Sequence, residues 1–221
     1  MKTFSESRLV AKMLLEINAI NFNVENPFSL SSGFLSPSYI DCRKIISYPK
    51  VRTKITELMI EKIDREIGSE VIKHIIGGET AGIPFASLVA EKLQLPLSYV
   101  RKTTKKHGKN KLIEGEIFSQ KECLLIEDLM TDGKSKIDFL NKIRDHNIIC
   151  NYGMVVFNYD IFPGTEKRLK ENKIEIHYLA CWEDVYNEIL EDSAFDTITT
   201  KQIKSFIDDP IKWSNERRYE Y

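Results

Sequence analysis

The chain has 221 residues, which suits one substantial domain with appendages and is short for two. A net charge of -1, with 42% hydrophobic and 29% charged residues, is typical of a soluble globular protein and argues against binding to nucleic acid or an anionic membrane. No apolar run approaches membrane-spanning length and the charged N-terminus lacks a signal-peptide core, which predicts a cytoplasmic protein.

The N-terminal part of the chain predicts two helices with a strand-like segment between them. Thr3 and Glu6 have the spacing of a capping box, and apolar residues then repeat at helical spacing from Leu9 to Ile20. Residues 28–41 are Ser-rich and strand-like. Pro49 suits a first helical turn, and an apolar face follows over 51–63.

From residue 71 onward, short apolar runs alternate with amphipathic helical segments. We expect strands at 71–76, 97–100, 123–126, 154–157 and 174–179, and helices at 83–93, 137–143, 166–171 and 182–190. This alternation predicts an α/β fold, a mostly parallel sheet with helices on both faces. Ligands of such sheets bind at the carboxyl ends of the strands, which is where the turns GGETAG and MTDGKS fall.

The stretch CLLIEDLMTDGKSK, residues 123–136, carries the most specific chemistry. Two carboxylates, Glu127 and Asp128, precede a small-residue turn that leads into a helix. The free N–H groups and positive dipole of a helix N-terminus favour a phosphate group, and carboxylates accept hydrogen bonds from sugar hydroxyls or hold a divalent cation. A phosphorylated-sugar site is one interpretation. An ordinary strand-to-helix connection is the other, because Asp, Ser and Thr are favoured at helix caps.

Two further segments depart from the regular alternation. Residues 101–115, RKTTKKHGKNKLIEG, form a long basic insertion, which indicates either a working loop for an anionic ligand or a solvated loop without a role. Residues 196–221 contain a helix-like TKQIKSFIDD and a polar, aromatic end, for which packing on the body, packing on a partner subunit and fraying all stay open. The cysteines are scattered without a CxxC pair, so we expect buried free thiols at Cys42, Cys123, Cys150 and Cys181.

Together these segments resemble a type I phosphoribosyltransferase, and more narrowly an orotate phosphoribosyltransferase, over about residues 28–190. LIEDLMTDGKS resembles the phosphoribosyl-pyrophosphate motif, FSLSSGFLSPSYIDCR the N-terminal base-binding segment, and RKTTKKHGKNKLIEG the mobile catalytic loop. The resemblance implies the type I fold with a small N-terminal hood. It implies a single domain over 1–195, with the hood and base-binding segment at 1–48 and the mobile loop at 101–115, and a C-terminal extension at 196–221.

The resemblance also implies a role for each segment. Glu127 and Asp128 would bind the ribose hydroxyls, with Mg²⁺ held mainly through substrate oxygens and by these two acids. The 5-phosphate would bind the turn of Thr131, Asp132, Gly133, Lys134 and Ser135. The pyrophosphate would meet the loop of Gly77, Gly78, Glu79 and Thr80. Other substrate contacts would come from Arg101, Tyr39 and Arg43, and the catalytic residues would be Lys102, Lys105, His107 and Asp128. In the family the 101–115 loop reaches the neighbouring subunit's site, which implies a homodimer.

The implied reaction moves the 5-phosphoribosyl group from phosphoribosyl pyrophosphate to orotate, as in pyrimidine synthesis. This chain has Ser31, Ala81 and Ile161 where the family often has cations, and Arg43, Lys44 and Arg52 are the candidates to replace them. Transfer to another base is therefore an alternative. A non-catalytic sensor of phosphoribosyl pyrophosphate is a second alternative, although the intact basic loop argues against it.

Overall fold

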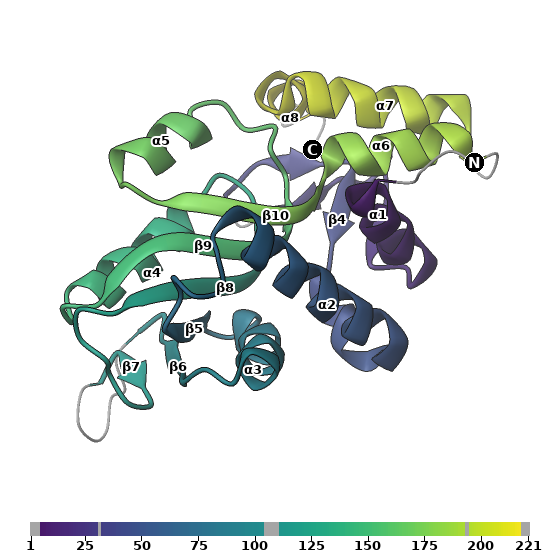
Figure 1. Ribbon diagram of the computed structural model, residues 1–221. Helices are drawn as coiled ribbons and strands as arrows, with labels where there is room; N and C mark the ends of the chain where they lie inside the picture. Colours follow the sequence, from purple (N-terminus) through teal and green to yellow (C-terminus); the bar gives the residue numbers. More distant parts are fainter. Residues whose placement is uncertain (1–4, 31, 104–110, 193–194, 218–221) are drawn as a thin grey trace.

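The computed structural model describes residues 5–30, 32–103, 111–192 and 195–217 of the chain (Figure 1). Its centre is a sheet whose strands, within these ranges, run in the order β10-β9-β8-β5-β6-β7. The strands are β5 (His74–Gly78), β6 (Leu97–Val100), β7 (Ile113–Glu114), β8 (Glu122–Met130), β9 (Ile149–Asn158) and β10 (Glu175–Cys181). All pairings are parallel except that of β7, which runs antiparallel to β6. The predicted mostly parallel sheet is confirmed.

Two predicted strand boundaries are wrong in ways that matter for the acidic and glycine-containing motifs. β8 continues to Met130 because its ladder with β9 extends through Glu127, so the two carboxylates belong to the strand and do not follow it. β5 begins at His74 and includes both Gly77 and Gly78, because these pair with the last residues of β6. The predicted turn GGETAG therefore starts inside a strand.

Helices cover both faces of the sheet, as predicted (Figure 1). One face carries α1 (Glu6–Glu16), α2 (Pro49–Glu66) and α3 (Gly82–Leu93), and the other carries α4 (Lys134–Arg144) and α5 (Thr165–Glu171). Because successive strand residues point to opposite faces, Leu124 and Ile126 join the larger core while Leu125 joins the smaller core against α4. The buried strands are apolar on both sides, as parallel sheets require.

The N-terminal hood stands over the carboxyl ends of the strands and consists of two small antiparallel pairs. β1 (Ile20–Phe22) pairs with β4 (Ser38–Ile40), and β2 (Phe28–Ser29) pairs with β3 (Leu35–Ser36). A 3-10 helix, η1 (Cys42–Ser47), follows and leads into α2. The first helix is capped by Ser5, whose Oγ accepts from the Arg8 N–H; the predicted cap at Thr3 lies outside the described residues.

The C-terminal segment packs on the body of the protein over 195–217. After α6 (Trp182–Glu191) come α7 (Thr197–Asp208) and α8 (Pro210–Arg217), and α8 contacts the hood. The Leu35 N–H donates to Ser214 Oγ at 2.9 Å, and the buried Trp213 ring meets Phe206 edge-on at 5.6 Å between centroids. Among the three alternatives left open for this segment, the described part packs on its own chain.

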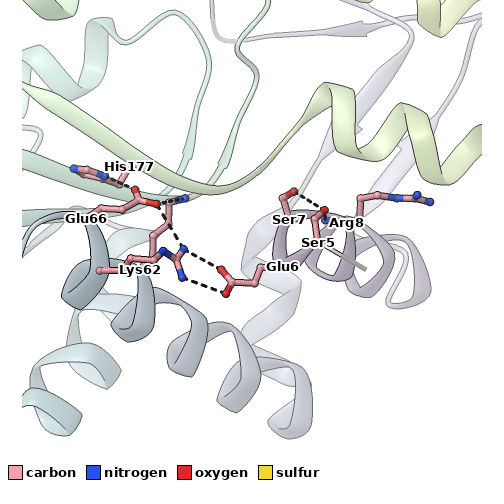
Figure 2. Close-up of polar contacts among 8 residues, drawn as sticks. Ser5, Glu6, Ser7, Arg8, Lys62, Glu66 and His177 are labelled. Atoms are coloured by element: carbon pink, nitrogen blue, oxygen red, sulfur yellow. Dashed lines mark hydrogen bonds and ion pairs between the residues drawn. The ribbon is translucent and has the colours of Figure 1, made fainter. Parts of the chain in front are cut away.

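Polar contacts join α1, α2 and the edge strand β10 on one face of the sheet. Arg65 of α2 donates to both carboxylate oxygens of Glu6, at 3.2 Å and 3.0 Å. Figure 2 shows Glu6 in this contact and Glu66 next to His177 and Lys62. His177 Nδ1 lies 2.8 Å from Glu66 Oε2. Burial raises the pKa of Glu66, but its contacts with His177 and Lys62 outweigh burial and lower that pKa overall. These contacts hold the two helices against the sheet edge.

All four cysteines are free thiols, as predicted; Cys42, Cys123 and Cys150 are buried as expected, whereas the prediction of burial is wrong for Cys181, which is partly exposed. None of the helices in the described ranges has the length and apolar content to cross a membrane.

Candidate active site

A cavity of about 530 Å³ opens where the hood meets the carboxyl ends of β5, β8 and β9. Of the side chains that the sequence singled out, eight line it: Tyr39, Arg43, Glu79, Thr80, Lys102, Glu127, Asp128 and Thr131. Thus residues from four separate segments share one cavity at the carboxyl ends of the strands, where ligands of parallel sheets bind.

Other predicted residues do not line this cavity. Gly78, Arg101 and residues 132–135 adjoin lining residues in the chain but do not line the cavity themselves. Lys105 and His107 lie outside the described residues, and so does Ser31. The described part of the site therefore includes Lys102, near the start of the basic insertion, but not the central residues of that insertion.

The two adjacent carboxylates have different surroundings. Glu127 is buried, and its Oε2 lies 2.5 Å from Nζ of the buried Lys136, in the first turn of α4. Asp128 forms no ion pair with a described residue. Burial, followed by the charge of Glu127, raises the pKa of Asp128 to about 6, while Lys136 and Arg43 act in the opposite direction. Asp128 is therefore the acid whose carboxylate is available to a ligand, and its charge changes near neutral pH.

Gly78 explains why the acidic strand can pack so tightly. A Cβ at Gly78 would lie 2.5 Å from Glu127 Oε1, so any side chain there would displace the buried carboxylate. We expected the glycines of this loop to let backbone approach a ligand; for Gly78 the space is taken by Glu127 instead. The glycine thus permits the Glu127–Lys136 ion pair to form beneath the cavity.

The turn of residues 131–135, called the phosphate turn because the 5-phosphate is expected there, is shaped by Gly133 and Asp132. Gly133 is the N-cap of α4 and has φ 79°, a left-handed conformation that glycine adopts readily. Asp132 accepts from the Lys134 N–H at 3.2 Å and pairs with Lys134 Nζ at 2.9 Å. Burial raises the pKa of Asp132, but both contacts with Lys134 outweigh it and lower the pKa overall. Asp132 therefore stabilises the turn, and Thr131 is the turn residue that reaches the cavity.

Of the three cations that the sequence offered as replacements, Arg43 is the one that lines the cavity. Its Nη2 donates to Tyr39 Oη at 3.1 Å and its Nε to Asp41 Oδ1 at 2.5 Å. Lys44 Nζ instead donates to the Asn18 carbonyl, and Arg52 Nη1 to the Ile46 carbonyl, both at 2.7 Å. Neither Lys44 nor Arg52 is among the residues that line the cavity, so the fold leaves Arg43 as the candidate cation there.

Sequence reasoning did not assign a site role to six residues that also line the cavity, which are Ser29, Leu30, Ile40, Ala81, Leu129 and Tyr159. The hood residues carried a signal, because they belong to the segment identified as base-binding. Tyr159 directly follows β9, so its place at a strand's carboxyl end was a usable signal as well. Its ring is 1% exposed, and burial raises the pKa of its hydroxyl.

Fold, cavity and the acidic strand with its phosphate turn together define a phosphoribosyltransferase. Residues 44–150 match the family model described as the phosphoribosyl transferase domain. A structure of orotate phosphoribosyltransferase from Aeropyrum pernix shares the fold, with a TM-score of 0.71 at 23% identity over 83% of this chain and 99% of that chain. The structure of Leishmania donovani UMP synthase reaches a TM-score of 0.78 at 23% identity, covering 92% of this chain and 42% of the other.

Curated relatives narrow the class. The orotate phosphoribosyltransferase of Ruegeria sp. (strain TM1040) is 47% identical over 212 residues, covering 96% of this chain and 94% of the relative. That of Rhizobium rhizogenes (strain K84) is 44% identical over 216 residues, covering 96% and 93%. The chain belongs to the orotate phosphoribosyltransferase family.

Proposed function

We propose that the chain transfers the 5-phosphoribosyl group from phosphoribosyl pyrophosphate to orotate, giving orotidine 5-monophosphate and pyrophosphate in pyrimidine nucleotide synthesis. The observation that supports this most directly is the cavity that brings Asp128 and Thr131 of the donor motif opposite Tyr39 and Arg43 of the hood. Identity of 47% to a curated enzyme of this name over nearly the whole chain supports the same assignment.

The donor would bind along β8 and the start of α4. Asp128 would accept hydrogen bonds from the ribose hydroxyls, with Glu127 beneath it fixed by Lys136. The 5-phosphate would meet the turn of residues 131–135, where the N–H groups of the helix N-terminus and the Thr131 hydroxyl favour an anion. Thr80, which lines the cavity, would contact the pyrophosphate, with Glu79 and Gly78 beside it.

The acceptor would bind under the hood. Orotate carries a carboxylate, and Arg43 offers a planar, permanently charged fork that matches a carboxylate in geometry. Tyr39 holds that fork through its hydroxyl and lines the same wall. This arrangement would compensate for the uncharged Ala81 and Ile161.

The chemistry is a displacement at C1 of the ribose. The bond from C1 to the pyrophosphate oxygen breaks, the ring nitrogen of orotate bonds to C1, and negative charge grows on the departing pyrophosphate. Lys102 lines the cavity and would stabilise that charge, and we assign the same role to Lys105 and His107, with Arg101 contributing positive charge from beside the cavity. A hood over the cavity would exclude water, which would otherwise capture the activated sugar.

The residues of this site fit a Mg²⁺ ion that binds together with the substrate. Among the described residues, no group of three or more His, Cys, Asp and Glu has the arrangement of a metal site. Mg²⁺ prefers one or two carboxylates together with substrate phosphates and water, and Asp128, with Glu127 next to it, supplies such oxygens. When bound, Mg²⁺ would neutralise pyrophosphate charge.

We further propose that residues 1–195 act as one phosphoribosyltransferase domain, that the protein is cytoplasmic, and that it works as a homodimer with the 101–115 loop serving the partner's site. Mixing a Lys105→Ala protein with an Asp128→Ala protein tests the dimer. Each variant alone should be nearly inactive, and the mixture should regain activity at sites that combine an intact loop with an intact acid. A mixture as inactive as its components contradicts the shared site.

A single assay tests the reaction itself. Purified protein, Mg²⁺ and phosphoribosyl pyrophosphate are mixed with orotate, uracil or a purine base, and pyrophosphate release is followed. We expect turnover with orotate alone. Turnover only with another base contradicts the proposal and favours the second candidate, which the uncharged Ala81 and Ile161 motivate. Tight donor binding without turnover on any base favours a sensor.

A further inference from the structure

Glu79 poses an electrostatic problem for the proposed function. Glu79 lines the cavity at the end of β5, on the side where the negatively charged pyrophosphate group of the donor would bind. Two like charges at contact distance repel by about 1 kcal/mol even in bulk water and by more in a cavity. A negative side chain in this position therefore requires either a cation that neutralises its charge or a functional role.

The structure provides two partners, and both follow the neighbouring strand β6. Glu79 Oε1 lies 3.3 Å from Arg101 Nη1, and Glu79 Oε2 accepts from the Lys102 N–H at 2.8 Å. The Glu79 N–H also donates to the Val100 carbonyl at 2.9 Å. Both carboxylate oxygens are thus used, and the residue after β5 is joined to the residues after β6.

Arg101 is itself held from several sides. Its Nε donates to Glu114 Oε1 of β7 at 3.1 Å, and its Nη2 to Tyr99 Oη at 3.2 Å. Its backbone N–H donates to the Leu112 carbonyl at 2.8 Å. The side chain is 18% exposed, so this guanidinium is part of a fixed cluster and not a free surface charge.

The backbone of Lys102 is held on both of its polar groups. Glu79 accepts from its N–H, and Lys142 Nζ of α4 donates to its carbonyl oxygen at 2.8 Å. The Lys102 side chain lines the cavity. An anchored backbone restricts where a long, flexible ammonium side chain can reach, which lowers the entropy cost of placing it.

We infer that Glu79 is a positioning residue: it fixes the Lys102 backbone so that the Lys102 ammonium faces the departing pyrophosphate, while Arg101 neutralises the Glu79 charge. The inference rests on the proposed function for the identity of the anion. It assigns to Glu79 no contact with substrate or metal, which separates it from the other residues of its loop.

The test compares four proteins: wild type, Glu79→Ala, Lys102→Ala and the double variant. We expect Glu79→Ala to lower kcat about tenfold or more, since misplacing a charged group by about 1 Å can cost 10²-fold. The KM for the donor should change little, because Glu79 itself does not bind it. The double variant should match Lys102→Ala within about twofold, because a residue that acts through Lys102 has nothing left to position. Glu79→Gln, which keeps an acceptor for the Lys102 N–H, should retain intermediate activity.

Glu122→Gln is the matched control, because Glu122 also accepts from a backbone N–H, that of Asn151 at 2.8 Å, but lies at the amino end of β8 and does not line the cavity. It should keep kcat within about threefold, because the contact that it loses is remote from the site. Titration of the four proteins with magnesium pyrophosphate compares their affinities for the departing group without turnover. This comparison is therefore valid even if orotate is not the substrate. Failure of the wild type on orotate contradicts the proposed function alone.

Three results would overturn the positioning role. Additive losses in the double variant would mean that Glu79 does not act through Lys102. A lower donor KM with tighter pyrophosphate binding in Glu79→Ala would mean that the carboxylate merely opposes the anion. A raised Mg²⁺ requirement in Glu79→Ala and Glu79→Gln alike would make Glu79 a metal ligand.

Discussion

Replacing Lys136 with methionine removes the cation that neutralises Glu127 beneath the cavity. The side chains of Lys136 and Glu127 are 4% and 8% exposed, and their charged atoms are 2.5 Å apart. The other oxygen of Glu127 is buried and has no hydrogen-bond partner among the described residues. Removing one partner of a buried pair costs about 3–5 kcal/mol, because a buried charge is left without compensation.

The assay is urea and thermal unfolding of the Lys136→Met protein. For a chain of this size a loss of 1 kcal/mol lowers the midpoint by about 2–4 °C, so the expected decrease is roughly 6–20 °C. Lys134→Met is the matched control. Lys134 also pairs with an acid of the same region, but its side chain is 67% exposed, and its loss should cost less than about 1 kcal/mol.

The double variant Glu127→Gln with Lys136→Met isolates the charge. It should recover most of the stability that Lys136→Met loses, because a neutral pair leaves no buried charge. A Lys136→Met protein less than about 1 kcal/mol below wild type would refute the reasoning. So would a double variant as unstable as the single one, since packing rather than charge would then dominate.

Three further predictions follow from the same structure. Because the pKa of Asp128 is raised to about 6, its ionised fraction falls as pH falls through 6, and kcat/KM for the donor should fall with it; Asp128→Asn should remove this acidic limb, and a limb that persists in the variant contradicts the assignment. Arg43→Met should lower kcat/KM for orotate about tenfold or more. Lys44→Met should stay near wild type, because the Lys44 ammonium donates to the Asn18 carbonyl outside the cavity. Equal effects of both substitutions would exclude Arg43 as the partner of the orotate carboxylate. Trp213→Ala should cost about 3–5 kcal/mol in unfolding free energy, because the ring is 1% exposed; a loss below about 1 kcal/mol would mean that α8 contributes little to the fold.

The sequence predicted the order of strands and helices because that information is local. Apolar runs of strand length and helical repeats recur along the chain, and each is readable within its own segment. Strand ends were less accurate, as β8 shows. Whether Glu127 and Asp128 belong to the strand depends on pairing with β9, a segment that local periodicity does not include.

The candidate site was predicted as a set of motifs, and it is the fold that converts them into a cavity. Asp128, Thr131, Glu79 and Thr80 could be expected near one another, because the carboxyl ends of neighbouring parallel strands share one edge. The contact of Glu79 with Lys102 could not be expected in the same way. It depends on the side-chain directions of two residues that follow different strands.

By itself, the sequence determined the alternation of elements, the pair of carboxylates with the small-residue turn after them, and the family resemblance, each of which resides in contiguous residues. Only the tertiary structure decided that Lys136 buries Glu127, that Arg43 reaches the cavity while Lys44 does not, and that α8 packs on the hood. The last contact joins Leu35 and Ser214, which are 179 residues apart. Such pairings depend on the packing of distant segments, and no local pattern of residue types encodes which distant partner a side chain will meet.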